Sequence, residues 1–276
     1  MNIDLHSHSR ASDGLLSPAA LVGLAAARGV DVLALTDHDD LSGLEEAARA
    51  ADEHGIRLIN GVEISSVWRD ELSVHVVGLG VSTDDVELCG GLERIRHSRA
   101  ARAERMADSL AKAGIPGALE GALTYAGNAS LLSRTHFARF LSDNGYARDT
   151  RSVFNHFLVP GKPGYVEHQW ALLEDAVKWI RSSGGTAVLA HPGRYGLPRA
   201  TMRELLGEFR DMGGEAVEVL SGSHSPEQFR EFAMLAKEFG LTASRGSDFH
   251  GPGESRTELG ALPLMPPGVT PVWQSW

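Results

Sequence analysis

The sequence predicts an α/β fold, a distorted (β/α)7 TIM-like barrel with a helical insertion between its fourth and fifth strands. Short aliphatic runs typical of buried strands alternate with helix-like stretches along most of the chain. Seven such runs suit one barrel better than two separate domains. The connection between the fourth and fifth runs is more than 100 residues long, whereas a βαβ unit needs only about 30. We therefore interpret that interval as an insertion.

The predicted elements follow one another in a regular order. The strand runs cover residues 2–6, 31–36, 57–62, 73–78, 186–190, 216–220 and 241–244. Several helices between them have recognisable ends, where serine caps the start and glycine ends the last turn. These are a helix from Ser17-Pro18 to Gly29, one with a capping box at Ser42 and Glu45 that ends at Gly55, and one with a capping box at Ser225 and Gln228 that ends at Gly240.

The insertion divides the chain into a barrel of residues 1–85 and 166–276 and a helical cap domain of residues 86–165. Its clearest helix is predicted over 92–113, before Gly114, with shorter segments over 134–144 and 149–158. A stretch rich in proline and glycine, residues 159–164, returns the chain to the barrel. The proline-rich residues 262–276 are expected to form an extended tail.

Composition excludes several classes of protein. With 276 residues, 42% of them hydrophobic, the chain can bury a large core. No apolar run approaches the roughly 20 residues of a transmembrane helix, and no signal peptide precedes the first strand, so we expect a cytoplasmic protein with no membrane partner. The single cysteine, Cys89, excludes a disulfide framework and a cysteine-cluster metal site.

Charge is distributed unevenly along the chain. The net charge of -10 argues against binding to long nucleic acid. Between Arg94 and Lys162, however, eleven Lys or Arg residues stand against five Asp or Glu. A basic segment inside an acidic body favours a short anionic ligand.

Histidines and carboxylates gather at the predicted strand ends. His6 and His8 terminate the first run, and the period of a strand places both rings on one side. In an α/β barrel the carboxyl ends of the strands share one face, so these residues are expected to become neighbours. The candidate metal ligands are His6, His8, Asp13, His38, Glu63, His75, His191, Asp248 and His250.

Nine ligands are too many for one ion and suit two or three divalent cations that share carboxylates. A set of nitrogen and oxygen donors without thiolate favours Mn, Zn or Fe. A single histidine at a strand end is more often a hydrogen-bonded structural residue, but the joint placement reverses that expectation. Glu218 and His224, near the sixth run, are interpreted as groups that support the ligands or contact substrate.

These strand-end motifs resemble those of the PHP (polymerase and histidinol phosphatase) family of metal-dependent phosphoesterases. The motifs occupy residues 4–9, 34–39, 61–65, 190–192 and 246–250. The resemblance implies three metal ions, with Mn as the expected one. The implied ligand sets are His6, His8, Glu63 and Asp248; Glu63, His75 and His191; and Asp13, His38 and His250. Asp13 stands where some relatives have histidine.

The insertion resembles the branch of this family that removes phosphate from nucleoside 3′,5′-bisphosphates, and it is similar to short-RNA 5′ exonucleases. Its motifs occupy residues 102–105, 133–138 and 161–166. Independently, Arg99 and Arg102 fall on the apolar stripe of the predicted helix, where a guanidinium needs an internal carboxylate or an anionic ligand. The candidate substrate contacts are Arg99, Arg102, Arg105, Arg134, His136, Lys162, Tyr165, Arg194 and His224. His136 and Tyr165 are also candidates for helix capping or packing.

Together these features predict a metal-dependent phosphatase for a small nucleotide, with the 3′-phosphate of a nucleoside 3′,5′-bisphosphate as the expected target. Divalent ions deprotonate a bridging water that attacks phosphorus, and Asp248 accepts or steers the proton. The alternatives are a 5′-3′ exoribonuclease on short RNA, a histidinol-phosphatase-like enzyme, an amidohydrolase-like enzyme that cleaves a C-N bond, and a catalytically silent module that binds a nucleotide or a partner protein.

Overall fold

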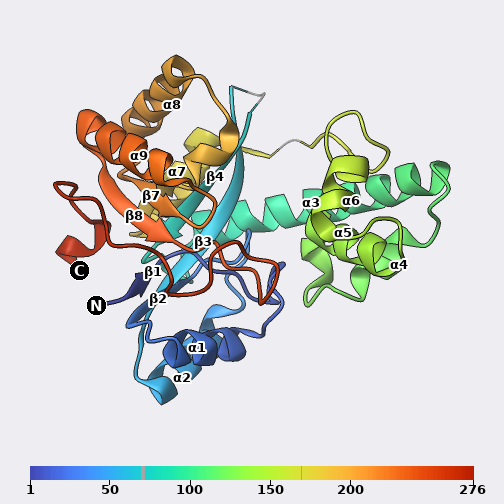
Figure 1. The fold of residues 1–276 in the computed structure, drawn as a ribbon, viewed down its shortest axis with the longest axis horizontal. Helices are drawn as coiled ribbons and strands as arrows, with labels where there is room; N and C mark the ends of the chain where they lie inside the picture. Colours follow the sequence, from blue (N-terminus) through green and yellow to red (C-terminus); the bar gives the residue numbers. More distant parts are fainter. Residues whose placement is uncertain (70–71, 169) are drawn as a thin grey trace. The chain divides into compact units, whose positions relative to one another are not determined.

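The computed structural model describes residues 1–69, 72–168 and 170–276, and its chain separates into two compact units. The barrel unit comprises Met1–Leu92 and Trp170–Trp276, and the inserted unit comprises Glu93–Gln169. The boundary between them falls within helix α3 (Val86–Lys112). Figure 1 shows the helices and strands of the chain with their labels.

The barrel unit is built on a sheet that closes nearly into a barrel, as the sequence predicts. Its strands lie in the order β1-β2-β3-β4-β6-β7-β8, with β5 paired to β3. The two ends of this order meet, because Leu5 N donates to Arg245 O at 3.0 Å and Asp248 N donates to His6 O at 2.9 Å. The strands are β1 (Ile3–Asp4), β2 (Val32–Leu35), β3 (Arg57–Trp68), β4 (Leu72–Leu79), β5 (Ala171–Leu172), β6 (Thr186–Leu189), β7 (Ala216–Ser221) and β8 (Thr242–Gly246).

Strand β4 differs from the alternating parallel pattern that the sequence predicts. It runs antiparallel to both β3 and β6, since β3 and β4 follow each other directly as a hairpin. Strand β3 is also longer than expected and continues to Trp68. Glu63 therefore lies inside a strand and not at its end. The short strand β5 was not predicted.

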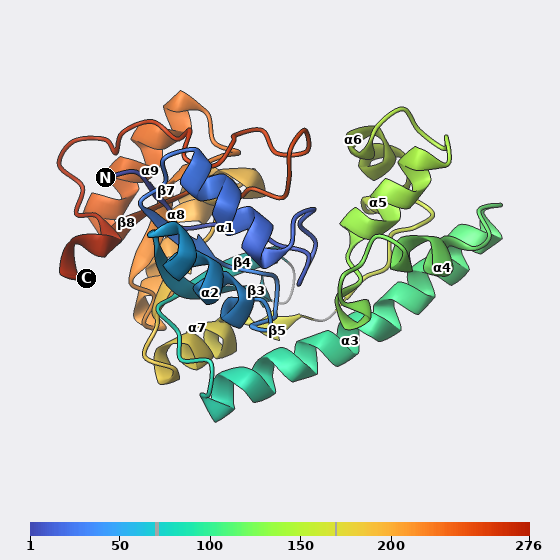
Figure 2. The ribbon, with the colours of Figure 1, turned by 90° about the horizontal axis from the view of Figure 1, so that it is seen from below.

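Helices cover the outside of the sheet in the barrel unit. α1 and α2 pack side by side (Figure 2) and enclose an apolar layer that includes Leu21, Leu33 and Leu44. Two predicted helix starts are confirmed: Ser17 caps α1, and Ser225 forms a capping box with Gln228 in α9. The helices of this unit besides α3 are α1 (Pro18–Ala27), α2 (Leu44–His54), α7 (Leu173–Ser182), α8 (Arg199–Asp211) and α9 (Pro226–Phe239).

The capping box predicted at Ser42 is wrong. Gly43 occupies the N-cap position of α2 and makes no side-chain cap bond. The Ser42 N–H instead donates to Asp40 Oδ1 at 2.7 Å, which closes a turn before the helix. The carboxylate of an Asp can accept from the backbone N–H two residues later, and this local hydrogen bond competes with helix capping.

The barrel interior is filled by small and β-branched side chains from successive strands, among them Ile3, Val77 and Val188. At the seam between β1 and β8 the backbones approach closely. A Cβ atom added to Gly246 would lie 2.1 Å from the Cβ of His6. Only glycine allows this approach, so Gly246 fixes the position of the first predicted ligand.

The inserted unit has its own apolar core, which includes Met106, Phe137 and Leu141. Its helices besides α3 are α4 (Ala118–Leu123), α5 (Arg134–Asp143), α6 (Thr150–Val153) and a π-helical turn over Phe154–Leu158. Helix α3 begins at Val86, six residues before the predicted start. In the part of the chain that the structure describes, no helix is both long and apolar enough to span a membrane.

The predicted tail is largely extended and ends in a 3-10 turn over Val272–Ser275. Ala243 in β8 pairs with Pro271, and Ala243 N donates to Thr270 O at 2.8 Å. This segment therefore covers backbone groups of β8, and Val272 joins the barrel core.

Candidate metal centre

The nine predicted ligands come together around one buried carboxylate, that of Glu63. Its Oε1 lies 2.7 Å from His75 Nδ1 and 2.8 Å from His191 Nε2. Its Oε2 lies 3.1 Å from His6 Nε2, 3.2 Å from His8 Nε2 and 3.1 Å from His38 Nδ1. Five rings from four segments of the chain thus converge on one side chain. His75 lies close to Glu63 because β3 and β4 form a hairpin, in which Glu63 pairs with Val77 and Ser65 pairs with His75.

Four atoms of the cluster fit the first coordination sphere of a divalent ion. They belong to His6 (Nε2), His8 (Nε2), Glu63 (Oε2) and Asp248 (Oδ1). Each is buried and lacks a hydrogen-bond partner among the described residues. The nitrogen-to-oxygen distances between them run from 3.1 to 3.6 Å. Ligand atoms about 2.1 Å from a shared ion at tetrahedral angles lie about 3.4 Å apart, so the spacing suits Zn, Mn or Fe.

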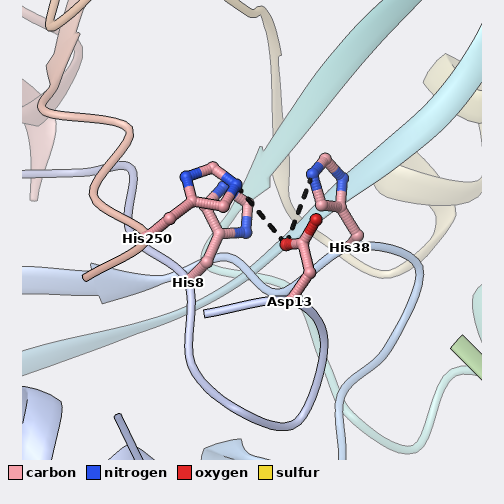
Figure 3. Close-up of side chains that lie close together, drawn as sticks. All are labelled: His8, Asp13, His38 and His250. Carbon is pink, nitrogen blue, oxygen red and sulfur yellow. Dashed lines mark ion pairs between the residues drawn. The ribbon is translucent and has the colours of Figure 1, made fainter. Parts of the chain in front are cut away.

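Asp13 gathers a second group of ligand atoms with His8, His38 and His250. Figure 3 shows its carboxylate between the rings of His38 and His250, with the ring of His8 beside that of His250. Asp13 Oδ1 lies 3.4 Å from His250 Nε2 and 3.9 Å from His38 Nε2. A third group comprises His38, Glu63 and His75. His191 Nε2 is hydrogen-bonded to Glu63 in the same region.

The three carboxylates of the cluster are held as anions by the rings around them. Burial by itself would raise the pKa of Glu63, but the neighbouring His38 and His6 hold it well below its ordinary value. The pKa values of Asp13 and Asp248 are lowered in the same way, against the effect of burial, by His38 and His6 respectively, together with His250. Three buried carboxylates so close together require compensating positive charge, which protonated histidines or bound cations can supply.

Two of the candidate ligands adopt backbone conformations that non-glycine residues rarely take. His191 has φ 28° and Asp248 has φ 55°. Such strain persists where the surroundings hold the residue in place, and it concentrates at functional sites. Tyr195 is one of the residues that hold this region, since its hydroxyl donates to Ala190 O at 2.8 Å and accepts from His75 N at 3.0 Å.

Asp37 and Asp39, which flank His38, hold backbone segments of the site. Asp37 accepts from Ser9 N at 2.7 Å and from the hydroxyl of Ser12, so it shapes the loop that carries His8 and Asp13. Asp39 accepts from Ser65 N at 2.7 Å. Both carboxylates are buried.

Arg194 lies at the metal cluster, whereas His224 lies beneath it. Arg194 NH1 donates to Asp248 Oδ2 at 2.8 Å, and about half of its side chain is exposed. His224 is buried and bonds to backbone through both ring nitrogens, at 3.0 Å to Gly193 N and 3.2 Å to Val219 O. The structure therefore gives His224 a supporting place behind the His191 turn.

Buried arginines cluster within the inserted unit. Arg99 and Arg102 are 4% and 5% exposed, as their place on the apolar stripe predicts. Arg102 Nε donates to Val166 O at 3.2 Å. Burial, together with the nearby Arg134 and Arg99, lowers the pKa of Arg102 to about 9. Three guanidinium groups of the inserted unit therefore lie close enough together to influence one another.

The remaining predicted substrate contacts of the inserted unit differ in exposure. Arg134 is half-buried, with NH1 3.5 Å from Leu158 O, while Arg105 and Lys162 are exposed. His136 is fully buried, and its Nδ1 accepts from Ser133 N at 3.0 Å in the capping box of α5. Tyr165 is half-buried and lies near Arg102, where it raises the pKa of that guanidinium against the larger effect of burial.

Comparison with known proteins relates the chain to a family. The sequence model of the family described as the PHP domain matches residues 4–219. The chain is 50% identical, over 99% of its length and 95% of the relative, to a 3′,5′-nucleoside bisphosphate phosphatase of Chromobacterium violaceum. It is 44% identical, over 99% of its length and 93% of the relative, to the 5′-3′ exoribonuclease Rnm of Escherichia coli.

A solved structure from Bifidobacterium adolescentis, described as a metal-dependent phosphoesterase, matches with a TM-score of 0.83 and 26% identity. The match covers 92% of this chain and 91% of the other. The likeness therefore extends over about nine-tenths of both chains.

Proposed function

Because the chain belongs to the PHP domain family and is a metal-dependent phosphoesterase, we propose that its reaction is removal of the 3′-phosphate from nucleoside 3′,5′-bisphosphates. The observation that carries the proposal is the convergence of five histidine rings on Glu63, with the neighbouring Asp13 and Asp248 groups. The relative named as a bisphosphate phosphatase supports the choice of substrate, since the match covers nearly the whole of both chains.

The residues of the barrel unit would hold two or three divalent ions, with Mn²⁺ as the proposed metal. Ions bound here would supply a nucleophilic water at neutral pH and neutralise charge on the phosphoryl oxygens. Glu63 and Asp248 supply the negative charge that retains cations. His6, His8, His38, His75, His191 and His250 supply neutral nitrogen ligands, and Asp13 completes the set.

Asp248 is the proposed proton acceptor in the reaction. One of its oxygens, Oδ1, faces His6 and His8, whereas Oδ2 is hydrogen-bonded to Arg194. A proton taken up at Oδ2 would change the contact with Arg194 and leave the other oxygen in place. Arg194, half exposed beside this carboxylate, is the proposed contact for the phosphoryl group that is transferred.

The second phosphate of the substrate is assigned to the arginines of the inserted unit. Arg99 and Arg102 are buried, and Arg134 lies close enough to lower the pKa of Arg102. Guanidinium groups bind phosphate oxygens through paired N–H donors, so these side chains have the chemistry that a phosphate site requires. Binding energy from this remote phosphate would position the reacting one. Arg105, Lys162, Tyr165 and His136 are proposed as further contributors to that region, and His224 as a support of the His191 turn.

A phosphate-release screen tests the proposal. The Mn²⁺-loaded protein is given adenosine 3′,5′-bisphosphate, 3′-AMP, 5′-AMP and an aryl phosphate, and the nucleotide product is identified by chromatography. We expect the bisphosphate to be the best substrate and 5′-AMP to be the product. Release of the 5′-phosphate, or equal turnover of all four compounds, would contradict the proposal. Absence of all turnover in metal-replete protein would favour a silent binding module.

A second candidate function is 5′-3′ exonucleolytic hydrolysis of short RNA, which the match to the exoribonuclease Rnm favours. Both functions need the same cations and a site for a terminal phosphate. The discriminating measurement is kcat/KM for the bisphosphate against kcat/KM for a 5′-phosphorylated RNA of three to five nucleotides. A ratio below one, with mononucleotides released from the 5′ end, would make the exonuclease the better description.

A further inference from the structure

Strand β7 carries none of the nine predicted ligands, yet Glu218 on this strand contacts two of them. Its Oε1 is 2.6 Å from Nδ1 of His6, and its Oε2 accepts from the backbone N–H of His191 at 2.6 Å. The side chain is 1% exposed. Both oxygens are therefore engaged, each with a ligand from a different strand, and neither points toward the atoms that face Glu63.

From these contacts we infer that Glu218 is a positioning residue that sets the tautomer of His6 and the backbone conformation of His191. The inference deepens the proposed function, because it rests on the proposed metal cluster. A carboxylate can only accept at His6 Nδ1, so that atom carries the proton. In the neutral ring that would bind a cation, the lone pair then lies on Nε2, the atom that faces Glu63 Oε2 at 3.1 Å.

The hydrogen bond from the His191 N–H to Glu218 lies at a residue whose backbone conformation is strained. His191 has φ 28°, a value that its surroundings must hold. Glu218 fixes its N–H, and His224 fixes the N–H of Gly193 two residues later. The ring of His191 can then reach Glu63 Oε1 at 2.8 Å. A single buried carboxylate thus couples a ligand that follows β1 to a ligand that follows β6.

A local irregularity of β7 accompanies this placement. Glu218 pairs with Ser244 and Leu220 pairs with Arg245, so Val219 is an extra residue in the ladder. Such a bulge re-aims neighbouring side chains and is common beside functional sites. The carbonyl of Val219 is bonded to His224, the same ring that supports Gly193. Bulge and carboxylate therefore support the His191 turn from one strand.

The substitution E218Q tests the inference, because an amide replaces one acceptor by a donor. If its oxygen accepts from His6, the amide N–H opposes the N–H of His191. If it is turned round, the amide donates to His6 Nδ1 and the ring proton must move to Nε2. Either arrangement impairs a ligand. We expect apo E218Q to bind Mn²⁺ at least tenfold more weakly than wild type in calorimetric titrations.

The matched control is E215Q, an exposed glutamate just before β7, which should bind Mn²⁺ as wild type does. Circular dichroism and urea unfolding of the apo proteins establish that the variants are folded. A folded E218Q with unchanged Mn²⁺ affinity would overturn the inference. No substrate is used, so a wrong assignment of the substrate leaves this result unaffected.

A measurement on the unsubstituted chain removes the dependence on folding of the variant. In the protein loaded with diamagnetic Zn²⁺ and labelled with ¹⁵N-histidine, the His6 ring, assigned by loss of its signals in H6N, should carry its proton on Nδ1. A neutral His6 ring protonated at Nε2 would contradict the proposed role of Glu218. A merely structural carboxylate would not determine which ring nitrogen is protonated.

Discussion

Arg194 NH1 lies 2.8 Å from Oδ2 of Asp248, while the other oxygen of the same carboxylate faces His6 and His8 at 3.6 and 3.3 Å. Asp248 thus stands between the buried cluster and a half-exposed guanidinium. The carboxylate is 9% exposed by its side chain, against 51% for Arg194. This pair marks the boundary between the metal cluster and solvent.

Asp248→Asn should lower kcat/KM by at least about 100-fold, the scale of a lost acid-base group. The amide also weakens the ligand set, because it removes the negative charge that faces two imidazoles. Phosphate release and bound Mn²⁺ would both be measured. Asp52→Asn, an exposed position on α2, serves as the control. Wild-type turnover by Asp248→Asn would exclude the proposed role.

Arg194→Gln should reduce kcat by about 100-fold, as expected when one donor to the developing phosphoryl charge is removed. Since the Arg194 side chain is half exposed, the fold and the Mn²⁺ content should be retained. Arg194→Lys keeps the positive charge but loses the planar guanidinium group, so its kcat should lie between those of wild type and Arg194→Gln. A change confined to KM would show that Arg194 binds substrate without acting on the reacting group.

Arg102→Gln should raise KM for a 3′,5′-bisphosphate by about 10- to 100-fold, the range of one charge-assisted hydrogen bond. KM for a substrate with one phosphate should change far less. Removal of the Arg102 guanidinium also removes its repulsion with Arg99 and Arg134. The free energy of unfolding of the inserted unit should therefore fall less than the loss of a buried side chain would otherwise cause. Arg151→Gln, an exposed position on α6, is the control. Equal effects on both substrates would remove Arg102 from the second-phosphate site.

Chelation of metal should destabilise the barrel unit selectively. Without cations, the buried carboxylates of Glu63, Asp13 and Asp248 lose a source of compensating charge. Hydrogen exchange should accelerate in β3 and in the turn after β8, and added Mn²⁺ should reverse the change. Peptides of α5 in the inserted unit should be unaffected. Uniform acceleration across both units would argue against a local metal cluster.

The inserted unit should lose stability as pH falls. Burial, together with Arg102 and Arg99, lowers the pKa of His168 to about 3. Below the unfolded value of about 6.5, the unfolded chain takes up a proton that the folded chain excludes. The free energy of unfolding of the inserted unit therefore falls as the pH drops from 6.5 towards 5. His168→Gln should reduce this slope between pH 6.5 and 5, as measured by hydrogen exchange of α3 and α5, with no difference at pH 7.5.

The barrel and the grouping of its ligands could be predicted from sequence, because both depend on local signals. Strand ends are marked by polar residues that interrupt aliphatic runs, and the helix ends at Ser17 and Ser225 follow from capping chemistry. The direction of β4 could not be predicted this way. A strand has the same period in either direction, and only its tertiary partners decide whether it pairs parallel or antiparallel.

The contacts of Glu218 were also beyond local reasoning. The residue lies within a fully buried run, Ala216–Ser221, where periodicity gives no preferred face. Its partners, His6 and His191, lie 212 and 27 residues away along the chain. Likewise, the backbone bonds of Asp37 and Asp39 depend on loop conformations that the sequence pattern leaves undetermined.

The ligand side chains lie on both sides of the inserted unit in the chain, and this order constrains biosynthesis. His6, Glu63 and His75 leave the ribosome early, whereas Asp248 and His250 follow only after β8 has been made. A nascent chain that has reached the inserted unit still lacks the seam strand and one of the carboxylates. The complete set of candidate ligands therefore exists only after the last strand of the barrel has been made, so the site cannot be assembled while the inserted unit is still being synthesised.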